Sequence, residues 1–177
     1  SINRHLAIRE DVNHLRSLGD VLITEPKNAK SLMAKAKGTA IKEKTGKTSR
    51  KKRFGKSIRN RCPGYFQSQA EMKFTSTGGR YIEVPYAYRA SQYDHTNGEY
   101  AKRKLSQRLF PLSDGTAVQR DLYSSFILSN AAIRDGMVMI DSRRCNDAFP
   151  SFKGMHDSEM ERIRLSGKKV LNSGIRV

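Results

Sequence analysis

The chain has 177 residues, and its 34 lysines and arginines against 17 aspartates and glutamates give a formal net charge of +17. This length suffices for one domain with a small additional part, and the charge indicates a polyanionic partner, first of all nucleic acid. No apolar run approaches the roughly 20 residues of a membrane-spanning helix, so no membrane partner is expected. The two cysteines, Cys62 and Cys145, suggest no disulfide framework and fit a reducing, cytoplasmic compartment.

The N-terminal part predicts a helix, a strand and a second helical segment. Apolar residues recur at close to helical spacing over residues 2–18, and Gly19 ends that pattern. Residues 20–25 form a short apolar run that predicts a strand buried on both faces. Residues 27–37 have helical character.

A basic segment follows at residues 38–61. Its density of positive charge buries little apolar area, and Glu43 is its only acid from residue 42 onward. The interpretation we favour is an arm that contacts phosphates, and the alternative is a solvated charge run with no specific role. The basic residues are Lys42, Lys44, Lys47, Arg50, Lys51, Lys52, Arg53, Lys56, Arg59 and Arg61.

The rest of the chain alternates between regular and polar segments. We expect a helix at 65–75, a strand at 80–84, an irregular polar stretch at 86–118, a helix at 121–133, a loop-like stretch at 136–157 and a basic helix at 158–170.

Glu25 and Asp121 are the candidate site acids. Glu25 ends the expected strand, where a buried carboxylate needs a basic partner, several donors or a metal ion. Taken alone, the residue is better explained as a solvent-facing glutamate before Pro26, since surface glutamates are common. Asp121 begins a helix, where capping alone explains an aspartate. Together they match the late two acids of an RNase H-like site, in which carboxylates hold two Mg²⁺ ions roughly 4 Å apart.

Several stretches of the sequence, in their order along the chain, resemble the C-terminal half of TnpB-type proteins. These proteins are transposon-encoded RNA-guided nucleases related to type V CRISPR effectors. The resemblance covers about residues 5–130 and depends on the order and spacing of the stretches. They are Leu18-Gly19-Asp20 to Glu25, Arg53 to Ile58, Arg61-Cys62-Pro63-Gly64, Gly78 to Pro85, Ser91-Gln92, Leu105-Ser106-Gln107-Arg108 and Gln119 to Phe126.

The resemblance implies an α/β fold, namely a partial RNase H-like (RuvC) fold. Glu25 corresponds to its second catalytic acid and Asp121 to its third, with Mg²⁺ as cofactor. The implied organisation is a RuvC part over 1–85, an insert over 86–118, a terminal RuvC helix over 119–135 and a basic tail over 136–177.

The chain departs from the family at two points. The family's first RuvC aspartate lies upstream of anything present here, so cleavage would need an N-terminal half or a second copy. The family's four zinc cysteines align approximately with Asp94, Thr96, Leu112 and Asp114, a set that would bind zinc poorly, so we expect a metal-free loop or small hairpin. This insert stays basic, and its candidate phosphate-binding residues are Arg89, Arg103, Lys104 and Arg108.

Two functions follow as expectations. The first is the nucleic-acid-binding part of a Mg²⁺-dependent, RNA-guided DNA endonuclease, which contacts guide RNA and target DNA in a cytoplasmic, nucleoid-associated particle. The second is a cleavage-incompetent derivative that binds RNA or DNA and stabilises a guide RNA complex. A generic basic RNA-binding protein of the ribosomal kind ranks last, because it leaves the ordered matches unexplained.

Overall fold

The computed structural model describes residues 2–26, 44–46, 60–104, 106–167, 170 and 173–175. These residues form a mixture of helices and strands, which confirms the expected α/β class. The chain divides into two compact units, Ser1–Glu83 (unit 1) and Val84–Val177 (unit 2). The helix expected at 27–37 and most of the basic segment 38–61 lie outside the described residues.

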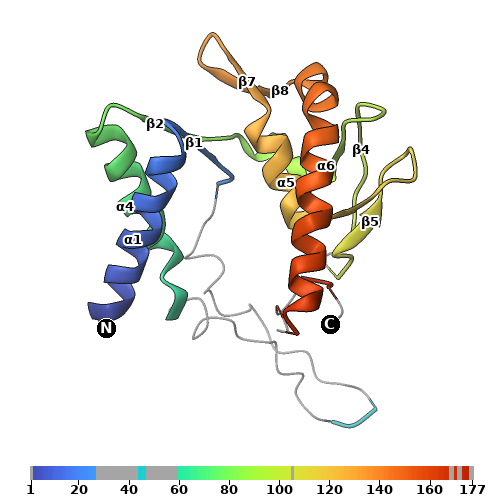
Figure 1. Ribbon diagram of the computed structural model, residues 1–177, viewed down its shortest axis with the longest axis horizontal. Coiled ribbons are helices and arrows are strands. Elements are labelled where there is room, and N and C mark those ends of the chain that lie inside the picture. The colour runs from blue at the N-terminus through green and yellow to red at the C-terminus, as the bar shows by residue number, and fades with distance from the viewer. Residues whose placement is uncertain are drawn as a thin grey trace. The chain divides into compact units, whose positions relative to one another are not determined.

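Two helices that lie side by side form the core of unit 1, α1 (Ile2–Leu18) and α4 (Pro63–Ser76) (Figure 1). Both expected helices are therefore confirmed. Ile8 and Val12 of α1 and Ala70 of α4 are buried, and Phe66 and Tyr81 pack against them. The N-terminal apolar positions of α1 are exposed, so its burial is confined to the middle of the helix.

The described part of unit 1 also contains a parallel strand pair. β1 (Val21–Thr24) pairs with β2 (Arg80–Glu83) in the register Val21↔Arg80 to Thr24↔Glu83. Parallel neighbours require a long crossover connection, and α4 lies within this one and packs on β2. The expectation that β1 is buried on both faces is wrong, because Val21 is exposed and the other three residues are half-buried.

Gly79 makes the junction between α4 and β2 possible. Its N–H donates to the carbonyl of Phe74 at 2.8 Å, and the next N–H, from Arg80, donates to the carbonyl of Asp20 at 2.7 Å. A Cβ on Gly79 would lie 2.6 Å from that Asp20 oxygen. Only glycine therefore permits this approach of the two backbones.

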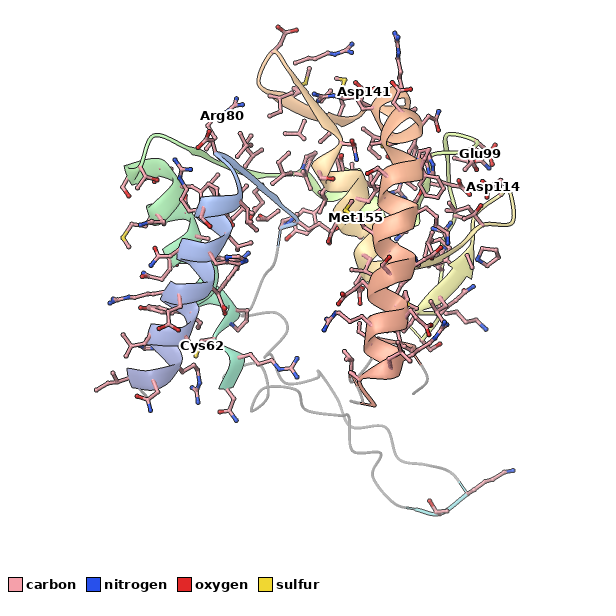
Figure 2. The ribbon with its side chains drawn as sticks, in the orientation of Figure 1. Cys62, Arg80, Glu99, Asp114, Asp141 and Met155 are labelled. Carbon is pink, nitrogen blue, oxygen red and sulfur yellow. The ribbon has the colours of Figure 1, made fainter. Side chains whose placement is uncertain are left out.

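The insert at 86–118, expected to be irregular, contains short regular elements. Two single-turn 3₁₀ helices, η1 (Tyr86–Tyr88) and η2 (Ala90–Gln92), are followed by two antiparallel hairpins. The hairpins pair β3 (Tyr93–Asp94) with β4 (Glu99–Tyr100) and β5 (Leu109–Pro111) with β6 (Ala117–Gln119). Figure 2 labels Glu99 and Asp114 on these two hairpins.

Aromatic side chains form the core of unit 2. They lie between α5 (Arg120–Ser129) and α6 (Ser142–Leu165), which run side by side in Figure 1. Phe126 stacks on Phe152 with ring centroids 4.4 Å apart, and Tyr123, which is fully buried, meets Phe110 edge to face. Edge-to-face and offset stacks of this kind add stability beyond their buried area.

Two expectations for the C-terminal part of the chain are wrong. The helix expected to run to residue 133 ends at Ser129, and a hairpin of β7 (Ala131–Arg134) and β8 (Met137–Ile140) follows it. The stretch 136–157, expected to be a loop, holds β8 and most of α6, with Pro150 inside the helix. Asp141, at the start of α6 in Figure 2, caps the helix by accepting the N–H of Arg144 at 3.1 Å. Among the helices of the described part, none has the length and apolar character needed to cross a bilayer.

Candidate functional site

Glu25 lies directly after β1, as the sequence predicts, and lines a pocket in unit 1. The pocket has a volume of about 260 Å³. Its walls come from α1, from the carboxyl end of β1, from β2 and from the start of α4, and they include Ile8, Asp11, Thr24, Glu25, Arg61, Phe66 and Tyr81. The Thr24 hydroxyl donates to the Tyr81 hydroxyl at 3.2 Å, which fixes one side of the opening. The carboxyl ends of parallel strands are where α/β sheets commonly bind ligands.

Asp121 is the second residue of α5, and it is not the residue that caps the helix. The side-chain oxygen of Gln119 accepts the N–H groups of both Asp121 and Leu122 at 2.8 Å, so Gln119 is the N-cap. This arrangement leaves the Asp121 carboxylate outside the capping interaction. Its side chain is 60% exposed.

Two arginines lie beside the Asp121 carboxylate. Arg108 approaches one oxygen at 3.5 Å, and Arg120 approaches the other at 3.3 Å. The amide nitrogen of Gln119 also donates to Asp121, at 3.4 Å. Pairs this long and this exposed contribute only about 0–1 kcal/mol each, so the carboxylate stays available to other ligands.

A C-terminal segment packs against the same surroundings. The Gln119 amide nitrogen also donates to the carbonyl of Ser173 at 3.1 Å, and Gly174 lies so close to Arg108 that a Cβ there would be 2.5 Å from the Arg108 Cβ. Ser173 is buried. The segment at 173–175 therefore contacts Gln119 and Arg108, two residues whose side chains reach the Asp121 carboxylate.

Glu25 and Asp121 belong to different units, unit 1 and unit 2. A shared Mg²⁺ site formed by both acids thus stays a prediction. Within the described residues, no group of three or more histidines, cysteines or acids is placed to hold a metal ion.

Two of the four positions aligned with zinc cysteines, Asp94 and Thr96, belong to a hydrogen-bond network that is centred on Asp94 and also includes Ser113. One Asp94 oxygen accepts the N–H and hydroxyl of Thr96, at 3.0 and 2.7 Å, and the other accepts the N–H and hydroxyl of Ser113, both at 2.8 Å. Asp94 is only 4% exposed, and Leu112 beside Ser113 is buried as an apolar residue. The carboxylate therefore joins the β3–β4 turn to the β5–β6 turn.

The electrostatics of Asp94 follow from this network. Burial raises the pKa of its carboxyl, but the hydrogen bonds from Thr96 and Ser113 together outweigh burial and hold the pKa below its ordinary value. Asp94 is therefore charged at neutral pH, and all four of its bonds are charge-assisted.

The next residue, His95, is also buried in unit 2. The Tyr123 hydroxyl accepts the backbone N–H of His95 at 3.1 Å and lies 2.9 Å from its Nδ1. Because burial raises the pKa of Tyr123, this hydroxyl keeps its proton and can donate it to Nδ1. Burial lowers the pKa of His95, so the ring is neutral at pH 7. The buried pair joins the β3–β4 hairpin to α5.

Three arginines predicted to bind phosphates have intramolecular partners. The guanidinium carbon of Arg103 lies 3.8 Å from the centroid of the Phe110 ring, and Arg103 also donates to the Ser91 carbonyl at 3.1 Å. The guanidinium carbon of Arg89 lies 4.7 Å from the centroid of the Tyr100 ring. Arg108 pairs with Asp121 as given above. Lys44, Arg61 and Lys104 are exposed. Their contact with phosphates stays a prediction, and the other basic residues of the predicted arm, Lys42, Lys47, Arg50, Lys51, Lys52, Arg53, Lys56 and Arg59, lie outside the described residues.

Sequence reasoning missed the roles of Asp94 and Gln119. An aspartate two residues before a threonine is a pattern that predicts a local side-chain turn, and it signals the Asp94–Thr96 bonds. No local pattern signals the bonds to Ser113 or the cap at Gln119.

Comparisons with known proteins add no name to this site. No family model and no curated protein matches the chain.

Proposed function

We propose that the chain is the nucleic-acid-binding part of an RNA-guided, Mg²⁺-dependent DNA endonuclease of TnpB type. The observation that carries the proposal is the state of Asp121, whose carboxylate stays accessible at the start of α5 because Gln119 supplies the cap. Glu25, at the carboxyl end of β1, would be the second acid. The net charge of +17 supports binding to guide RNA and target DNA through their phosphates.

The RNase H-like fold is part of this proposal. The parallel β1–β2 pair, joined by a crossover that contains α4, supports it, since helical crossovers between parallel strands define the α/β folds to which RNase H-like proteins belong. The remaining strands and the first acid would come from an N-terminal half or a second copy. A nucleoid-associated location belongs to the same proposal.

Glu25 and Asp121 have the ligand chemistry that Mg²⁺ prefers, namely carboxylate oxygens. A bound metal ion would activate water and stabilise the leaving oxygen at a phosphodiester. The residues of this chain would position the ion, and Arg108 and Arg120 would hold the Asp121 side chain in place beside α5.

Substitution of Asp121 tests the proposal. In the assembled particle, Asp121→Asn should abolish Mg²⁺-dependent cleavage while the affinity for nucleic acid stays nearly constant. Asp147→Asn is the matched control, because it makes the same change on the 75% exposed side chain of an α6 residue. Cleavage by Asp121→Asn at the rate of the control would refute the catalytic role.

The alternative is a cleavage-incompetent module that stabilises a guide RNA complex. The pairing of Asp121 with Arg108 and Arg120 favours it, because this arrangement balances the acid's charge without a metal ion. Under this alternative no particle cleaves. Neutralising Lys51, Lys52 and Arg53 should then weaken RNA binding and flatten its dependence on salt.

A further inference from the structure

The pocket of unit 1 combines apolar walls with charged groups of both signs. Ile8 and Phe66 come from the two packed helices, and Tyr81 from β2, while Asp11 and Glu25 add two carboxylates and Arg61 adds a guanidinium. Apolar pockets that contain a few convergent polar groups are the usual binding sites of small ligands. A volume of about 260 Å³ suits a single ring system.

The polar groups favour a particular ligand chemistry. Carboxylates only accept hydrogen bonds, so Asp11, which the proposed cleavage chemistry does not use, selects a ligand that presents an N–H donor. Phe66 and Tyr81 offer aromatic surface to a planar ring, and Arg61 suits a phosphate attached to that ring. Cytosine, adenine and guanine present an exocyclic amino group, whereas uracil and thymine present a carbonyl oxygen at the corresponding position.

We propose that this pocket binds one amino-bearing nucleobase of a single strand, with Asp11 accepting from the base and Arg61 contacting the adjoining phosphate. The inference rests on the proposed function and deepens it, because it assigns base recognition to unit 1 beside the phosphate contacts. Asp11, which no part of the proposed cleavage chemistry uses, becomes a residue that determines specificity.

Asp11→Asn separates base recognition from general electrostatics. Removing one negative charge should strengthen any contact made only with phosphates. It should weaken binding of an amino-bearing base by about tenfold, because a charge-assisted hydrogen bond becomes a weaker, neutral one. Glu10→Gln removes the same charge from the neighbouring exposed position of α1, outside the pocket, and is the matched control. Because Asp11 is itself exposed, its substitution leaves the core of unit 1 intact.

The experiment follows isoleucine methyl signals of the whole chain by NMR during titration with CMP and with UMP. The Ile8 signal should shift and saturate with CMP and respond more weakly to UMP. The affinity for CMP obtained from this signal should fall about tenfold in Asp11→Asn and stay unchanged in Glu10→Gln. Ile127, fully buried in unit 2, should stay constant and serves as the internal reference. Equal responses to CMP and UMP, or stronger CMP binding by Asp11→Asn, would overturn the proposal. So would a shift caused by ethylguanidinium and not by CMP, which would indicate a site for a cationic side chain.

Two oligonucleotides distinguish this proposal from the proposed function. One is an oligocytidine, and the other is an abasic strand of equal length with the same phosphates. If both bind equally and Ile8 does not respond, the chain binds nucleic acid through phosphates alone and the pocket proposal is wrong. If CMP shifts Ile8 while neither strand binds, the pocket is a nucleotide site and the proposed function fails.

Discussion

Replacing Asp94 with asparagine tests whether its carboxylate holds the two hairpins of unit 2 together. The amide oxygen of asparagine can still accept from Thr96, but its NH₂ group then faces the N–H of Ser113, a donor against a donor. Two charge-assisted bonds to Ser113 are lost, each worth about 1.5–3 kcal/mol, and rotation of the Ser113 hydroxyl recovers part of the loss. We therefore expect the free energy of unfolding to fall by about 3 kcal/mol.

The assay is thermal unfolding followed by circular dichroism, with hydrogen exchange of peptides spanning 93–119 to assign the effect to unit 2. For a unit of this size, the expected loss lowers the unfolding temperature by about 12–24 °C. Asp114→Asn is the control. The Asp114 carboxylate accepts one side-chain hydrogen bond, from the N–H of Thr116, and the amide oxygen of asparagine can keep it. A loss for Asp94→Asn no larger than that of the control would refute the reasoning.

The same network predicts a dependence on pH. The folded-state pKa of Asp94 lies below its ordinary value, so its contribution to stability is present above pH ~4 and is lost as the pH falls toward the folded-state value. The stability difference between the wild type and Asp94→Asn should therefore be constant from pH 7 to about pH 5 and shrink below pH ~4. A difference that stays constant down to pH 3 would contradict the role of the charge.

Three further predictions concern the fold. Gly79→Ala places a Cβ against the Asp20 carbonyl and should destabilise unit 1 by about 1–3 kcal/mol in denaturant unfolding, whereas Gly64→Ala, with open space around it, should not. Because burial lowers the pKa of His95, its contribution is complete above pH ~6.5 and is lost as the pH falls below that value, so unit 2 should unfold at lower denaturant at pH 5.5 than at pH 7.5. His95→Gln should show a smaller change, and an equal change would exclude His95 as the cause. Finally, EDTA should leave the unfolding temperature of unit 2 unchanged, since a carboxylate joins its hairpins, and a fall in that temperature would reveal a bound metal ion.

Hydrophobic periodicity was sufficient to predict the described part of unit 1. The two helices and two strands described there lie within two residues of the expected positions, because apolar spacing and the breaks at Gly19 and Pro85 mark their ends. The burial of β1 was not predictable in this way, since an apolar run does not say how many layers cover it.

The C-terminal part shows where local signals mislead. Pro150 inside α6 indicates a break, yet the helix continues through it, because its aromatic face packs against α5. The dipeptide Asp135-Gly136 is a strong hairpin signal, which the prediction of a helix over residues 121–133 did not take into account. Both residues have the positive φ of a tight two-residue turn. The Asp94 network joins residues 19 positions apart, so no local pattern contains it.

The backbone hydrogen bond from the N–H of Arg80 to the carbonyl of Asp20 has a consequence for how unit 1 folds. Its two halves, α1 with β1 and α4 with β2, meet through tertiary contacts across a long stretch of chain. The entropic cost of bringing two segments of one chain together grows slowly with their separation along the sequence, by about 0.6 kcal/mol for each doubling. Insertions between the halves should therefore change the stability of unit 1 little, while its folding slows because the decisive contacts are non-local.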